Sequence, residues 1–147
     1  MVFEYIKRGS LYDLLYRERR KFSVHEVVRI NEDLASGMCY LHGSGVVHRD
    51  LKPANILVSE HMQCKIADFG LSKVKQESMT LRSRVGTPQY MAPELLSPDH
   101  LPHNEKVDVY SFSIMLVEIL SNEQPFLGKD PIQVQMHGTC LPPIYPF

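Results

Sequence analysis

The stretch VVHRDLKPANILV, residues 46–58, decides how this sequence folds and raises the question of what it does. Two apolar runs enclose five polar or charged side chains, namely His48, Arg49, Asp50, Lys52 and Asn55. A hydrophobic core disfavours such groups, because burying an unpaired charge is costly. A surface loop, in turn, does not need apolar residues on both sides. The combination indicates a segment with a function of its own.

The overall composition is that of one globular domain, or of a large piece of one. The chain has 147 residues, of which 44% are hydrophobic and 22% are charged, as in ordinary soluble domains. The formal net charge of −1 gives no reason to expect binding to nucleic acid or to an anionic membrane. No run of 18 apolar residues occurs, so the sequence predicts no transmembrane helix.

Three cysteines, Cys39, Cys64 and Cys140, stand far apart in the chain. Their odd number and wide spacing argue against a disulfide framework and fit a reducing compartment. The MVFEYIKRG start is too short and too polar for a signal peptide. We therefore expect a cytoplasmic location, a prediction that does not extend to any sensor or membrane segment upstream.

Local signals predict a long helix that begins after Ser23. Ser23 and Glu26 form the pattern of a capping box at its start, and Gly43 and Gly45 are expected to end it. Ser10 can cap a shorter helix before it. The apolar residues at helical spacing in the long helix are Val24, Val27, Val28, Leu34, Met38 and Leu41.

Other segments carry strand, loop and helix signals. Residues 1–6 are typical of a short strand, and residues 56–58 and 64–67 of a small hairpin. Residues 70–104 show no sustained period, and a loop of that length inside a domain is usually functional or mobile. Residues 105–120 are apolar nearly all round, which predicts a helix buried on every side.

Three motifs occur in a fixed order along the chain. HRDLKPAN, residues 48–55, fits H-R-D followed by four residues and Asn. DFG follows at residues 68–70, and APE stands at residues 92–94 within GTPQYMAPE. One such tripeptide is weak evidence, but the three in this order strongly resemble the protein kinase family. Within that family, the pattern resembles the tyrosine-kinase-like group of serine/threonine kinases.

The resemblance implies a protein kinase-like α+β fold, mostly helical, of which the chain supplies only the C-terminal, large lobe. Residues 1–9 resemble the hinge and its exit, residues 10–137 the large lobe with its catalytic and activation loops, and residues 138–147 a proline-rich end. Neither a G-x-G-x-x-G loop nor a V-A-I-K strand occurs in the sequence. We therefore expect residues 1–147 to be a partial kinase domain, truncated at both ends.

The resemblance assigns chemical roles to residues of these motifs, because phosphoryl transfer depends on positioning and charge compensation. Asp50 would accept or orient the proton of the substrate hydroxyl, and Lys52 would contact the transferring phosphate. Asn55 and Asp68 would hold Mg²⁺, which prefers oxygen ligands. Thr87 would bond Asp50 and Lys52 and help to select the substrate. Lys52 also favours serine and threonine over tyrosine as acceptors.

The comparison with a kinase hinge implies an ATP site. Glu4 and Ile6 would offer backbone groups to the adenine, Leu57 would lie beneath the ring, and Ser10 could reach the ribose. Taken without the three motifs, MVFEYI would be interpreted as an ordinary edge strand.

Four further residues are given structural roles by the resemblance. His48 and Phe69 are expected to pack in an apolar stack rather than to react. Asp108, inside an apolar helix, must be hydrogen-bonded and would anchor the catalytic loop. Glu94 is expected to be a buried carboxylate that lacks its arginine partner, which would destabilise the fold.

Arg49 beside Asp50 suggests regulation by phosphorylation. A phosphate in residues 71–87 could pair with Arg49 and Lys73 and order that segment. Ser83 is the first candidate for this phosphate, and Thr80 and Ser78 follow. An upstream activating kinase is the partner that such a site implies.

Three functions stay open on the sequence alone. The favoured one is a piece of an active serine/threonine kinase that uses ATP and Mg²⁺ to phosphorylate proteins, with little activity in this piece alone. The second is a non-catalytic binding or decoy module. The third is a remnant that does not fold by itself.

Overall fold

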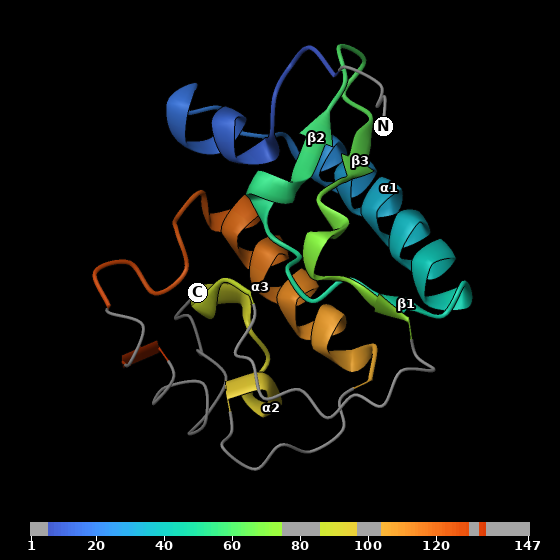
Figure 1. Cartoon of the computed structure of the whole chain (residues 1–147). Coiled ribbons are helices and arrows are strands. Elements are labelled where there is room, and N and C mark those ends of the chain that lie inside the picture. The colour runs from blue at the N-terminus through green and yellow to red at the C-terminus, as the bar shows by residue number, and fades with distance from the viewer. Residues whose placement is uncertain (1–5, 75–85, 97–103, 130–132, 135–147) are drawn as a thin grey trace.

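The computed structural model describes residues 6–74, 86–96, 104–129 and 133–134 (Figure 1). The other residues, among them most of the strand predicted at 1–6, lie outside the described part. Short helical turns are labelled η. The elements follow in the order η1 (Asp13–Arg17), α1 (Val24–Gly43), β1 (Val46–Val47), η2 (Pro53–Asn55), β2 (Ile56–Val58), β3 (Cys64–Ile66), η3 (Phe69–Leu71), β4 (Lys73–Val74), η4 (Pro88–Tyr90), α2 (Pro93–Leu96) and α3 (Lys106–Ser121).

Helix α1 begins where the sequence predicts. The Ser23 hydroxyl oxygen accepts a hydrogen bond from the backbone N–H of Glu26 at 3.3 Å. The Glu26 carboxylate accepts one from the backbone N–H of Ser23 at 2.9 Å, which completes the capping box. The bond from the Ser23 backbone N–H, together with bonds from the Arg20 guanidinium and the Ser23 hydroxyl, holds the pKa of the Glu26 carboxylate well below its usual value, at about 2.

One face of α1 enters the main core. Its buried residues are Val27, Ile30, Leu34 and Met38. Val24 and Val28, which share the predicted apolar pattern, are instead 79% and 48% exposed. The spacing of these two residues is helical, but they lie outside the buried face of α1.

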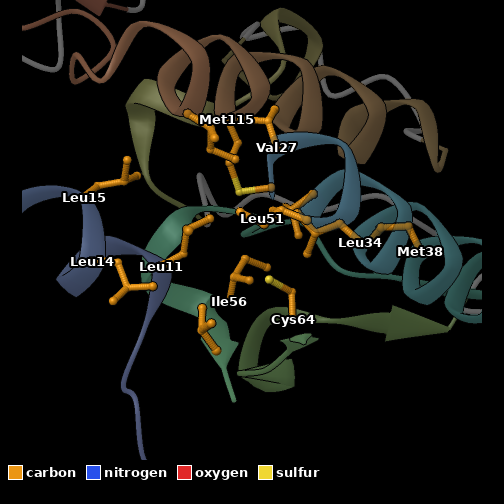
Figure 2. Packing of buried hydrophobic residues seen from close by; sticks show 13 residues of the cluster. Leu11, Leu14, Leu15, Val27, Leu34, Met38, Leu51, Ile56, Cys64 and Met115 are labelled. Carbon is orange, nitrogen blue, oxygen red and sulfur yellow. The ribbon is translucent and has the colours of Figure 1, made fainter. Parts of the chain in front are cut away.

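The main core joins segments that lie far apart in the sequence, as Figure 2 shows. Leu11 precedes η1, Leu14 and Leu15 belong to η1, and Met115 and Ile119 come from α3. Leu51 of the charged segment is fully buried among them, next to Ile56 and Val58 of β2 and Cys64 of β3. The apolar residues of the segment 46–58 therefore hold the predicted catalytic loop, residues 48–55, against the core.

Strands β2 and β3 form the predicted hairpin, with Ile56 opposite Ile66 and Val58 opposite Cys64. Helix α1 packs closely on this hairpin at Gly37, where an added Cβ would lie 2.9 Å from the side chain of Ile66. The carboxylate of Asp33 in α1 also accepts a hydrogen bond from the backbone N–H of Cys64 at 2.8 Å.

A second antiparallel pair joins β1 to β4, with Val47 opposite Lys73. The sequence did not predict this pair, because each strand has two residues and carries too little pattern. Val47 lies with Ala92 and Val107 in a smaller buried cluster. The β1–β4 pair ties the start of the catalytic loop to the segment that follows DFG.

Helix α3 occupies the segment that the apolar run predicts, but it is not buried on every side. Val109 is 52% exposed and Leu120 is 63% exposed. The prediction of complete burial was wrong for the described part of the chain, because the neighbouring elements cover one side of the helix. Its buried side carries two carboxylates, Asp108 and Glu118.

Two two-stranded sheets and a majority of helical residues confirm the predicted class, α+β and mostly helical. Within the described ranges, none of the helices combines the length and apolar character needed to cross a bilayer.

We expect Ser23→Ala to lower the free energy of unfolding by about 1 kcal/mol, because it removes the hydroxyl that caps α1. Urea unfolding followed by circular dichroism measures the change. Ser36→Ala is the matched control, because Ser36 is exposed in the interior of the same helix, where alanine is the better helix former. Equal stability of the two variants would contradict the role of the cap.

Candidate active site

The carboxylate of Asp108 holds the start of the charged segment. Asp108 is 1% exposed in the first turn of α3. Its two oxygens accept hydrogen bonds from the backbone N–H of His48 at 2.9 Å and of Arg49 at 2.7 Å. The His42 ring at the end of α1 lies 2.8 Å from the same carboxylate. Asp108 is therefore hydrogen-bonded, as its place in an apolar helix predicts.

His48 is fully buried and bonds both to Asp50, two residues later, and to Ala67, just before the DFG motif. Its Nδ1 accepts a hydrogen bond from the backbone N–H of Asp50 at 3.3 Å, so its Nε2 donates to the carbonyl of Ala67 at 3.0 Å. The His48 and Phe69 rings meet edge to face, with centroids 5.5 Å apart. The pair that the sequence predicts to pack does so, although Phe69 is 48% exposed.

The Asp50 side chain is the centre of a polar cluster. Its Oδ1 accepts hydrogen bonds from the backbone N–H and the hydroxyl of Thr87, at 3.0 and 2.9 Å. Its Oδ2 lies 2.7 Å from the Lys52 ammonium and accepts a hydrogen bond from the Asn55 amide at 3.1 Å. Lys52 also donates to the Thr87 hydroxyl at 2.7 Å. The structure thus brings together the four residues predicted to be catalytic.

Gly86 allows Thr87 to approach the catalytic loop so closely. Its φ is +128°, and an added Cβ would lie 2.9 Å from the backbone oxygen of Arg49. Any other residue would meet both a strained backbone conformation and a clash with main chain. The glycine of GTPQYMAPE is therefore needed for the contact between Thr87 and Asp50.

Two of the predicted residues offer oxygen donors of the kind that Mg²⁺ binds. The Asn55 amide nitrogen donates to Asp50, both to its backbone oxygen at 2.8 Å and to its carboxylate, so its carbonyl oxygen is the atom that could coordinate a cation. Asp68 is exposed and has a left-handed backbone, with φ 61°. An amide oxygen and an exposed carboxylate fit a hard cation.

The predicted nucleotide residues are partly brought together. Ser10 and Leu57 are paired in an isolated antiparallel bridge, and the backbone of Gly9 accepts a hydrogen bond from Val58 at 2.9 Å. The Ser10 hydroxyl donates to the carboxylate of Asp13 at 2.6 Å. Ile6 is half-buried, and Glu4 lies outside the described residues.

Of the predicted regulatory residues, Arg49 is the best described. It is 8% exposed, and its guanidinium donates a hydrogen bond to the carbonyl of Leu71. Its Nε is buried and finds no hydrogen-bond partner within the described ranges. The backbone of Lys73 belongs to β4. Ser78, Thr80 and Ser83 lie outside the described residues.

Glu94 differs from its predicted environment. It stands in α2 and is exposed, so the prediction of a buried carboxylate was wrong. Water can solvate an exposed carboxylate, and the penalty expected for an unpaired buried charge does not arise here.

A second buried carboxylate, which sequence reasoning missed, lies ten residues after Asp108 in α3. Glu118 is 1% exposed and accepts hydrogen bonds from the hydroxyls of Tyr16 at 2.5 Å and Tyr90 at 2.8 Å. Burial raises the pKa of Glu118 to about 7 and also raises the pKa of Tyr90. A glutamate within an apolar helix was the available signal, since such a group needs hydrogen-bond partners.

The cluster around Glu118 connects three elements of the site. Tyr16 belongs to η1 and Tyr90 to η4, the turn that follows Thr87. The Ser111 hydroxyl of α3 also donates to the backbone oxygen of Tyr90, at 2.7 Å. Helix α3 therefore positions η4 as well as the catalytic loop.

Comparison with known proteins gives consistent matches. The family model described as the protein kinase domain matches residues 1–141. A probable serine/threonine-protein kinase of Dictyostelium discoideum is 43% identical over 146 residues, which are 97% of this chain and 16% of the relative. The serine/threonine-protein kinase STY17 of Arabidopsis thaliana is 39% identical over 133 residues, 90% of this chain and 23% of the relative.

The serine/threonine-protein kinase CTR1 of Arabidopsis thaliana is 43% identical over 139 residues, 91% of this chain and 17% of the relative. Among solved structures, a chain of the yeast RNA Pol II CTD kinase CTDK-1 complex matches with a TM-score of 0.83 and 31% identity. That match covers 92% of this chain and 44% of the other. The chain thus spans less than a quarter of the length of these three curated relatives.

The raised pKa of Glu118 predicts a pH dependence of stability. The folded state keeps this proton up to about pH 7, whereas an unfolded chain releases it near pH 4.5. The stabilisation is complete below the unfolded pKa and is lost as the pH rises through 7. This stabilisation corresponds to roughly 3 kcal/mol of unfolding free energy.

We expect Glu118→Gln to abolish the loss of stability between acidic and neutral pH. Glutamine can still accept a hydrogen bond from a tyrosine hydroxyl, but it carries no charge at any of these pH values. The free energy of unfolding, measured by urea unfolding at several pH values between about 5 and 8, tests this. Glu123→Gln, at an exposed position just after the same helix, should leave the wild-type pH dependence intact. The assignment fails if Glu118→Gln and the wild type lose stability equally.

Proposed function

This chain belongs to the protein kinase family, and we propose that it is part of a kinase that transfers the γ-phosphate of ATP to serine and threonine hydroxyls of proteins, with little activity in residues 1–147 alone. The observation that carries the proposal is the cluster in which Thr87, Lys52 and Asn55 all contact the Asp50 carboxylate. The relatives named as serine/threonine kinases support the choice of acceptor.

The geometry suits general-base assistance at a hydroxyl. Asp50 is 7% exposed and is fixed from two sides, since Thr87 contacts one oxygen and Lys52 the other. A carboxylate held in this way can orient the attacking hydroxyl and accept its proton. The Lys52 ammonium lies beside it and can contact the negative charge of the transferring phosphate.

Asn55 and Asp68 would hold Mg²⁺ through their side-chain oxygens, and the metal, when bound, compensates charge on the ATP phosphates. The adjoining bridge between Ser10 and Leu57 supports a nucleotide position next to β2. We propose the residue ranges 1–9, 10–137 and 138–147 as hinge, large lobe and proline-rich end. The free thiols of Cys39 and Cys64 are compatible with the proposed cytoplasmic location.

We propose that an upstream kinase regulates this protein by phosphorylating Ser83, Thr80 or Ser78. The support comes from Arg49, whose buried Nε has no partner among the described residues. Leaving such a donor unsatisfied is costly, and a phosphate could bond it together with Lys73.

We expect Asp50→Asn to lower kcat by about a hundredfold or more in the natural full-length product, because the amide cannot accept the proton. Transfer of labelled phosphate to a generic protein substrate measures it. Asp33→Asn is the control, since the carboxylate of Asp33 bonds the backbone of β3, away from the Asp50 cluster. Normal turnover in Asp50→Asn would contradict the assigned role and favour a non-catalytic binding module.

We further expect residues 1–147 on their own to show at most trace phosphoryl transfer. The sequence contains no G-x-G-x-x-G loop to cover the phosphates and no V-A-I-K lysine to bind them. The same phosphate-transfer assay, with Asp50→Asn as the blank, measures the residual rate. Robust transfer that depends on Asp50 would show that these parts are dispensable.

A further inference from the structure

Glu118 shares a buried position with the hydroxyls of Tyr16 and Tyr90, and we call these three residues the Glu118 cluster. Tyr16 donates to the carboxylate at 2.5 Å, and Tyr90 donates to it at 2.8 Å. Glu118 is 1% exposed, and Tyr90 is 7% exposed. The cluster therefore keeps an ionisable group away from water at the place where η1, η4 and α3 meet.

No cation compensates a negative charge on Glu118 within the part of the chain that the structure describes. Arg17 of η1 pairs with Asp13 at 3.1 Å, and Lys52 pairs with Asp50 at 2.7 Å. The buried face of α1 is apolar. A buried carboxylate with hydroxyl donors alone is costly in its ionised form, and burial accordingly raises the pKa of Glu118 to about 7.

The titratable residue of η4 is Tyr90. Burial raises the pKa of its hydroxyl, so Tyr90 stays protonated in the range where Glu118 changes its charge. The charge of the cluster near neutral pH therefore depends on the Glu118 carboxyl and not on its partner in η4.

The position of Tyr90 determines the position of Thr87. The backbone N–H of Tyr90 donates to the carbonyl of Thr87 at 2.9 Å. Thr87 donates its own backbone N–H and its hydroxyl to Asp50, at 3.0 and 2.9 Å. A movement of Tyr90 away from α3 would therefore displace the residue that fixes the Asp50 carboxylate.

A cavity of about 240 Å³ adjoins this connection, and Tyr90, Thr87 and Tyr12 are among its lining residues. The Tyr12 ring lies against the Tyr16 ring, with centroids 4.9 Å apart. The cavity leaves room for Tyr90 to move and for water to approach an ionised Glu118. Since hydration stabilises a carboxylate, ionisation favours an open arrangement in which Tyr90 no longer bonds Glu118.

We propose that Glu118 is a pH-dependent positioning residue, which holds Tyr90 and η4 against α3 as a neutral acid and releases them when it loses its proton. Release would weaken the contact between Thr87 and Asp50. The proposal rests on the proposed kinase function and adds a regulation of the same site. Activity should decline as the pH rises through about 7.

Protons favour the closed arrangement, because Glu118 binds its proton more tightly when it is buried. The pKa is about 7 in the buried position and 4.5 for an ordinary glutamate. The equilibrium between closed and open arrangements therefore moves toward the open one as the pH rises between these values, and it levels off above them. From about pH 6 to about pH 8, the open population should rise about tenfold.

Backbone hydrogen exchange in residues 86–92 of the natural full-length product measures this opening. At each pH, the exchange rate of the wild type is divided by that of Glu118→Gln, so that the chemical pH dependence of exchange cancels. Glutamine keeps an oxygen that accepts from the tyrosines but has no proton to lose. We expect the ratio to rise about tenfold from about pH 6 to about pH 8.

Phosphoryl transfer to a serine peptide, measured with the same two proteins, tests the effect on the site. The titration of Asp50 is common to both proteins and cancels in the ratio of their kcat/KM values. We expect this ratio of wild type to Glu118→Gln to fall about threefold over the same pH range. The fall is smaller than the change in opening, because only the open molecules lose activity.

Two further variants separate proton binding from a purely structural role. Tyr16→Phe removes a donor that stabilises the ionised carboxylate, so it raises the pKa of Glu118 further and should move the rise in exchange to higher pH. It is compared directly with the wild type and gives the same test if Glu118→Gln does not fold. Glu123→Gln, at an exposed position after α3, should keep the wild-type behaviour.

The two measurements distinguish this proposal from the proposed function. Phosphoryl transfer with the same pH dependence in the wild type and Glu118→Gln would overturn the positioning role and leave the kinase function standing. Exchange that rises as expected in a product without any phosphoryl transfer would support the release of η4 and contradict the kinase function. The positioning role is also overturned if the exchange ratio stays constant with pH, if Tyr16→Phe leaves the rise where it is, or if Glu123→Gln removes it.

Discussion

The buried carboxylate of Asp108 is the constraint on which the rest of the site depends. It joins α3 to backbone groups of His48 and Arg49, which lie about sixty residues earlier in the chain. A carboxylate that is 1% exposed is tolerated only when its oxygens are bonded. Because it binds backbone N–H groups, it fixes the path of the main chain into the catalytic loop. The direction in which Asp50 presents its side chain follows from that path.

Helix α3 serves as a common scaffold for both sides of the site. Asp108 holds the catalytic loop, and Glu118 holds η4 through the hydroxyl of Tyr90. Thr87, which precedes η4, then meets Asp50 at 2.9 Å. The two carboxylates differ in their partners: two backbone amides and the His42 ring contact Asp108, and tyrosine hydroxyls contact Glu118. Stability and the geometry of the Asp50 cluster therefore depend on the same buried polar groups.

Much of the fold and of the candidate site was predictable because the signals are local or lie in short motifs. The capping box at Ser23 and the hairpin at residues 56–66 depend on neighbouring residues, and both are present. The HRD, DFG and APE motifs indicated the family, which the match over residues 1–141 confirms. The contact of Thr87 with Asp50 and Lys52 is also found.

The sequence by itself determined the family, the class of fold and the main local elements, because these follow from motif order and residue periodicity. Only the tertiary structure decided which apolar and charged residues are buried. Val24 and Glu94 are exposed, whereas Glu118 is enclosed by two tyrosines from distant segments. The tertiary structure also decided that β1 pairs with β4, because two-residue strands carry too little sequence pattern to predict a partner. Burial depends on which distant segments cover a side chain, and periodicity along the chain does not contain that information.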